Sequence, residues 1–136
     1  MLSRPEHGWS TVTIGRHKLD VSYIEPAAEM LVTTLIRALT CKEASVTFDA
    51  EGWHWRLDFS GDETRLTLMS SVTKTHVIPM TAREMAREVL GDLRRDMDAW
   101  SSFCSWSACC KQIAARLSTC MEFPFLGGTS KGGYPI

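Results

Sequence analysis

Apolar and polar residues alternate along much of the first half of the chain, which indicates β-strands. Residues 9–14 alternate serine, valine and isoleucine with threonine, and the alternation resumes over residues 19–23 after Gly15 and Arg16. A period of two is typical of half-buried strands, and a glycine between two such runs is typical of a tight turn. The pattern therefore predicts a β-hairpin close to the start of the chain.

The clearest strand signal lies between residues 44 and 70. Alternating runs occupy residues 44–49, 53–59 and 65–68, with turn residues at 51–52 and 60–63. Three runs joined by short turns predict a three-stranded antiparallel meander. Residues 76–78 are predicted as a short edge strand, because the proline that follows suits an edge or a strand end.

Helical spacing of apolar residues appears in two regions, residues 26–40 and residues 82–120. Thr81 and Glu84 match a capping box, in which each residue bonds the backbone of the other and a helix begins. A single helix of about forty residues is far longer than is usual in a small domain. We therefore expect a break within residues 100–107.

The order β-β-α-β-β-β-α-α, with one further edge strand, predicts an α+β fold. We expect a mostly antiparallel sheet of four to six strands with the helices packed on one face. The strand phases place on the inward face Val12, Ile14, Val21, Tyr23, Val46, Phe48, Trp55, Leu57, Phe59, Leu66 and Leu68. They place on the opposite face Thr11, Thr13, Thr47, Asp49, His54, Arg56, Asp58, Arg65 and Thr67. Residues 1–122 are predicted to form one domain, and the glycine- and proline-rich residues 123–136 an irregular or flexible tail.

Composition narrows the classes of function. The 136 residues are 44% hydrophobic, which fits one globular domain, and 15 basic against 16 acidic residues disfavour nucleic acid as the partner. No stretch is apolar enough for a spanning helix, and the first ten residues lack the apolar segment of a signal peptide. Five cysteines without a CxxC pair suggest reduced thiols. We expect a cytoplasmic protein that does not bind membranes.

No motif nominates a catalytic residue, a cofactor site or a metal site. The cysteines at 104, 109, 110 and 120 do not have the spacing of a zinc knuckle, and the four histidines fall on different predicted elements. The cysteines are expected to be small buried hydrophobes, with one exposed thiol as an alternative. Enzyme activity is not predicted, although a catalytic set assembled only in the folded chain is left open.

The segment Trp53-His54-Trp55 has two interpretations. Two tryptophans at positions i and i+2 share a sheet face, and they favour core packing under the helices. Alternatively, Trp53 lies partly exposed near the strand start and anchors a partner, since tryptophan and arginine dominate interface hot spots. The candidate partner-binding residues are Trp53, His54, Arg56, Asp58 and Arg65.

The run Lys18–Ile24, the helix that follows it, and the run Val46–Leu57 resemble a pattern found in small bacterial α+β proteins of the polymorphic-toxin immunity type. The resemblance covers residues 9–100 and the pair Phe123-Pro124, and its motifs concern packing and turns. The cysteine-rich segment Phe103–Cys120 departs from this pattern. The resemblance implies a binding role by association and no catalytic signature.

These observations favour a small cytoplasmic module that binds another protein, as an immunity-type or regulatory protein. A second hypothesis is a small-ligand-binding protein or enzyme with a pocket between sheet and helices, close to Trp53, His54 and Trp55. A third is a secretion chaperone, which would dimerise. A homodimer is therefore also left open.

Overall fold

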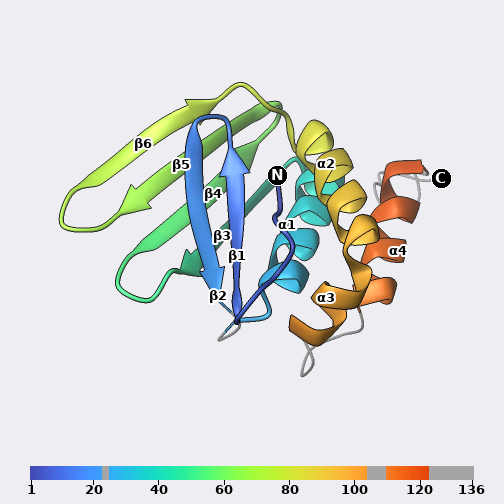
Figure 1. Cartoon of the computed structure of the whole chain (residues 1–136). Helices are drawn as coiled ribbons and strands as arrows, with labels where there is room; N and C mark the ends of the chain where they lie inside the picture. Colours follow the sequence, from blue (N-terminus) through green and yellow to red (C-terminus); the bar gives the residue numbers. More distant parts are fainter. Residues whose placement is uncertain (23–24, 104–109, 123–136) are drawn as a thin grey trace.

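The computed structural model describes residues 1–22, 25–103 and 110–122, and its elements confirm the α+β fold (Figure 1). In chain order they are β1 (Trp9–Ile14), β2 (His17–Ser22), α1 (Ala27–Cys41), β3 (Glu43–Asp49), β4 (His54–Ser60), β5 (Glu63–Met69), β6 (Thr73–Ile78), α2 (Ala82–Arg95), α3 (Met97–Phe103) and α4 (Cys110–Glu122). The expected edge strand at residues 76–78 is the end of the longer β6. Tyr23 and the expected tail at 123–136 lie outside the described residues.

The strands form two hydrogen-bonded sheets. Strands β3-β4-β5-β6 make a four-stranded antiparallel sheet, and β1 and β2 make a separate hairpin. Val46 lies opposite Leu57, which lies opposite Leu66, so these apolar side chains form a row across the larger sheet. The division into two sheets was not predicted. The alternation of apolar and polar residues shows which face of a strand is buried, but it does not show which strands pair.

The hairpin lies across the inner face of the four-stranded sheet, and the helices pack on the same side (Figure 1). Trp55 on β4 is at the centre of this contact and is completely buried. Its indole Nε1 donates a hydrogen bond to the backbone oxygen of Asp20 on β2, at 2.9 Å. The same indole stacks on Phe48, with ring centroids 4.5 Å apart. One side chain therefore connects the larger sheet to the hairpin.

The helix boundaries follow local chemistry. Lys42, which follows α1, has a left-handed φ of 66°, and its N–H still bonds Ala38 O. The expected capping box opens α2, since Glu84 N donates to Thr81 Oγ1 at 3.1 Å and Thr81 N donates to Glu84 Oε1 at 2.9 Å. The side chains of the expected apolar stripe of α2, Met85, Val89 and Leu93, are fully buried.

The long C-terminal helical pattern is interrupted at Asp96. This residue separates α2 from α3, with φ −114° and ψ 35°. Of the range 100–107, in which a break is expected, residues 100–103 belong to α3 and residues 104–107 lie outside the described residues. The break at Asp96 was not predicted, because the apolar stripe passes through this position without interruption.

Truncation of the inner face should destabilise the fold far more than truncation of the outer face. Leu57 is fully buried on β4, and Val77 on β6 is 64% exposed. Leu57→Ala should lower the free energy of unfolding by about 2–5 kcal/mol, because it leaves a cavity in the core. Val77→Ala is the control and should change it by about 0.5 kcal/mol or less. Urea denaturation measures both, and equal losses would contradict the assignment of faces.

The capping box should make stability depend on pH. The backbone and side-chain hydrogen bonds with Thr81 lower the pKa of Glu84 below its usual value of 4.5. This stabilisation is present above the unfolded-state pKa and is lost as the pH falls through the folded-state pKa. The stability advantage of the wild type over Glu84→Gln at pH 7 should therefore shrink as the pH is lowered below 4.5, as urea denaturation at a series of pH values would measure. Glu43→Gln, at an exposed carboxylate on β3 outside the capping box, is the matched control. Its stability relative to the wild type should change less over the same pH range.

Candidate functional site

The outward side of the four-stranded sheet is a candidate interaction surface. We use "outer face" for the side chains of β3 to β6 that point away from the hairpin. In the part of the chain that the structure describes, no element packs over this face (Figure 1). Strand register arranges its central side chains in two rows, Ser45-Asp58-Arg65-Val77 and Thr47-Arg56-Thr67-Thr75.

The arginines of the outer face pair with carboxylates of the same face. Arg56 Nη2 lies 2.9 Å from Asp58 Oδ1, and Ser45 Oγ donates to the same carboxylate oxygen at 2.5 Å. Arg65 on β5 pairs with Glu63 two residues earlier. Both arginines remain about half exposed, so these pairs contribute little to stability. The charged groups are thus ordered by their neighbours and accessible from solvent.

Four of the five candidate partner-binding residues share this face. His54 is exposed, and its Nε2 lies 3.9 Å from Asp49 Oδ1. Together with Arg56, Asp58 and Arg65 it belongs to the outer face. Trp53 does not, because its side chain is half-buried against the core on the opposite side of the strand.

Val77 is a further residue of the outer face and was not among the predicted candidates. It follows Thr75 at a spacing of two, so it lies on the outer face beside Arg65. An exposed valine at the edge of this sheet adds apolar surface to an otherwise polar area. The sequence pattern could have indicated this position, because alternation along β6 places Ile78 on the inner face and therefore Val77 on the outer face.

A small apolar cavity lies between the larger sheet, the hairpin, α1 and α3. The cavity found there has a volume of about 10 Å³, which is no more than one water molecule needs. It is lined by apolar side chains, among them Val12, Leu31, Phe48 and Trp100. This cavity is therefore too small to hold a ligand.

A surface groove of about 370 Å³ lies where the end of α1, the β4–β5 turn and the start of α2 meet. Two of its polar side chains form hydrogen bonds within the fold. Thr81 belongs to the capping box, and Arg83 donates to the backbone oxygen of Met121 at 3.3 Å. The groove shows structural hydrogen bonding and no pairing of a nucleophile with a base among its described lining residues.

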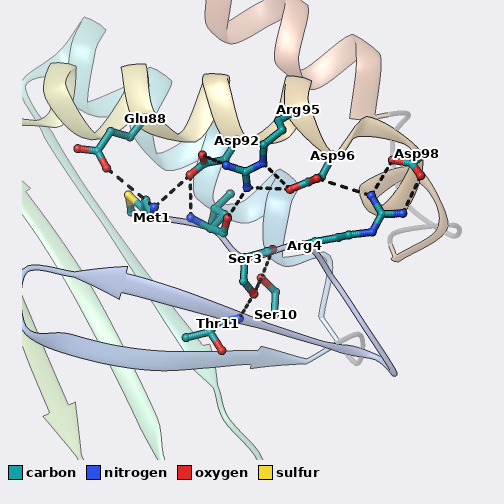
Figure 2. Close-up of polar contacts among 11 residues, drawn as sticks. Met1, Ser3, Arg4, Ser10, Thr11, Glu88, Asp92, Arg95, Asp96 and Asp98 are labelled. Carbon is teal, nitrogen blue, oxygen red and sulfur yellow. Dashed lines mark hydrogen bonds and ion pairs between the residues drawn. The ribbon is translucent and has the colours of Figure 1, made fainter.

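A second polar cluster, which we call the N-terminal clasp, binds the first residues of the chain to α2 and α3 (Figure 2). Leu2 N donates to Asp92 Oδ2 at 2.8 Å, and Arg95 Nη2 donates to Leu2 O at 3.0 Å. The guanidinium of Arg4 forms two hydrogen bonds with Asp98, at 3.2 and 2.8 Å. Asp96 lies between them, 2.7 Å from Arg95 and 3.6 Å from Arg4.

The clasp attaches this segment to the hairpin as well. Ser3 N donates to Thr11 O at 2.9 Å, and Leu2 lies opposite Val12 with its side chain buried. The hydrogen bonds and charge of Arg4 lower the pKa of Asp98, and those of Asp98 raise the pKa of Arg4. The clasp joins residues about ninety positions apart in sequence, so no local pattern could predict it. Its role is structural.

Two cysteine side chains lie among the described residues. Cys41 is exposed, and Cys120 on α4 is buried, which raises the pKa of its thiol. Cys104 and Cys109 lie outside the described residues, as does the side chain of Cys110. Among the residues described, no group of three or more His, Cys, Asp or Glu side chains could hold a metal ion.

Within the described ranges, no helix has both the length and the apolar character needed to cross a membrane. The sequence matches no known family model, no curated protein and no solved structure. Any inference about function therefore rests on the surfaces of the structure itself.

The buried carboxylate of the clasp should matter more than the exposed one. Asp96→Ala removes one of the three partners of Arg95, which keeps Asp92 and the backbone oxygen of Leu2. It should lower the free energy of unfolding by about 1.5–3 kcal/mol, the range for hydrogen bonds to charged groups. Asp98→Ala breaks the solvent-exposed pair with Arg4 and should lower the free energy of unfolding by less than Asp96→Ala does. Urea denaturation at neutral pH compares them. A larger loss for Asp98→Ala would contradict this description of the clasp.

Proposed function

We propose that this chain is a small protein-binding module of the immunity or regulatory type, which acts in the cytoplasm and binds its partner through the outer face. The observation that carries the proposal is the one-sided packing of the four-stranded sheet. The hairpin, α1 and α3 meet on its inner face, while the outer face displays ordered, accessible side chains.

The chemistry of the outer face suits a protein surface as partner. Arginine is enriched in protein interfaces, and Arg56 and Arg65 lie on neighbouring central strands. Two arginines stand here against four carboxylates, those of Glu43, Asp49, Asp58 and Glu63. An excess of carboxylates is unsuited to binding a phosphate backbone. It supports a protein partner whose surface carries a complementary pattern of positive and negative charges.

The paired charges allow a clean separation of binding from folding. Because exposed pairs contribute little to stability, reversing Arg56 and Arg65 should leave the domain folded. If the partner's surface is complementary to Arg56 and Arg65, the reversal places like charges opposite each other across the interface. This should weaken the binding free energy by several kcal/mol. Binding and stability are therefore expected to respond differently to the same substitutions.

The test is affinity capture from the native cells with matched charge reversals. The wild type should recover one protein in stoichiometric amount, and Arg56→Glu/Arg65→Glu should recover at least about tenfold less. Arg87→Glu/Arg116→Glu, at exposed positions on α2 and α4, is the control and should retain the partner. Circular dichroism and urea denaturation verify that all three proteins are folded.

A second readout distinguishes the immunity type from the regulatory type. For an immunity protein, the recovered partner should arrest growth when it is expressed alone, and co-expression of this chain should restore growth. Failure to recover any stoichiometric partner from abundant, folded protein would contradict the proposal. So would loss of the partner in the α2/α4 control with retention in the outer-face variant.

A further inference from the structure

Two histidine side chains from separate sheets meet on the inner side of the fold. His17 begins β2, and His76 lies near the end of β6. Their ring centroids are 4.6 Å apart, and the ring planes are tilted by 44°. The side chains are 59 positions apart in sequence, so only the docking of the hairpin on the larger sheet brings them together.

The ring nitrogens of this pair are available as ligands. In the described part of the chain, neither imidazole has a hydrogen bond or an ion pair, whereas His54 faces Asp49. Both side chains are half-buried, so solvent reaches them. A neutral imidazole presents one nitrogen lone pair and is the commonest protein ligand for divalent transition metals.

The separation of the rings fits a shared ion. Metal–nitrogen bonds of 2.0–2.1 Å in tetrahedral geometry place two ligating nitrogens roughly 3.4 Å apart. Two imidazoles with centroids at 4.6 Å can present nitrogens at that separation after small side-chain rotations. Water can complete the coordination, because both side chains are partly open to solvent.

We propose that His17 and His76 form a two-imidazole site for a divalent transition-metal ion of the Zn²⁺ or Ni²⁺ class. Such an ion would join β2 to β6, which belong to sheets that share no hydrogen-bonded strand pair. It would hold the hairpin on the larger sheet at the end opposite the Trp9–Ser22 pair. With two protein ligands, the ion exchanges with solvent and is not a permanent structural centre.

Cationic side chains near this site oppose the binding of a metal ion. Lys74 precedes His76 by two residues, so it lies on the same face of β6, and it is exposed. Arg16 and Lys18 flank His17 in sequence, and Lys18 lies on the opposite face of the hairpin. Removal of the charge at Lys74 should therefore strengthen metal binding, whereas a purely aromatic ring contact would not respond to it.

The test uses Ni²⁺ alone, because imidazole binds this ion well while thiolates favour softer ions. Isothermal titration calorimetry at pH 7.5 should detect one ion per chain in the wild type. His17→Phe and His76→Phe keep an aromatic ring in place, and each should weaken binding by about tenfold or more. His54→Ala, a histidine on the outer face, is the control and should bind as the wild type does. Lys74→Gln should bind more tightly.

Thermal unfolding provides an independent readout. Ni²⁺ should raise Tm in the wild type and in His54→Ala, but not in either phenylalanine variant, because only a ligand of the folded state stabilises it. Equal Ni²⁺ binding by the phenylalanine variants would place the ion elsewhere, on cysteines for example, and would overturn the proposal. The absence of heat and of any Tm shift at millimolar Ni²⁺ would overturn it as well.

Discussion

The burial of Trp55 between the four-stranded sheet and the hairpin is the constraint on which the rest of the structure depends. Two sheets without a shared hydrogen-bonded strand pair need a large apolar contact to stay together. Trp55 supplies it by stacking on Phe48 and donating its indole N–H to the backbone oxygen of Asp20. A buried indole with its polar group satisfied combines a large apolar area with a directional bond, so it also orients the hairpin.

This arrangement concentrates packing on one side of the larger sheet. The hairpin, α1 and α3 all approach the inner face around Phe48. The clasp binds the N-terminal segment to α2 through Asp92 and Arg95 and to α3 through Asp98, and the same segment pairs with the hairpin. The cavity on this side is too small to hold a ligand, whereas side chains of the outer face and of the edge strand β6 are accessible from solvent. The proposed protein interface follows from that asymmetry.

Sequence patterns predicted the features that depend on neighbours along the chain. Alternation assigned Trp55 and Leu57 inward and Arg56 outward, and the capping box at Thr81 located the start of α2. These features are set by strand and helix periodicity and by local hydrogen bonds. The candidate residues His54, Arg56, Asp58 and Arg65 were grouped correctly on one face for the same reason.

Features that join distant segments could not be predicted in this way. The separate hairpin sheet, the break at Asp96, the clasp and the contact of His17 with His76 each depend on tertiary docking. Trp53 illustrates the limit within one motif. Trp53 lies on the same side of the strand as Trp55. How far it is exposed depends on which elements pack over the start of the strand, and the alternation of apolar and polar residues does not show this.

The most direct test of a functional outer face is amide hydrogen exchange, measured by mass spectrometry on the chain alone and in complex with its captured partner. We expect the partner to slow exchange in β4, β5 and β6, while α2 and α4 exchange as in the free chain. Slowed exchange confined to α2 and α4, with the sheet unchanged, would contradict the assignment of the outer face as the binding surface.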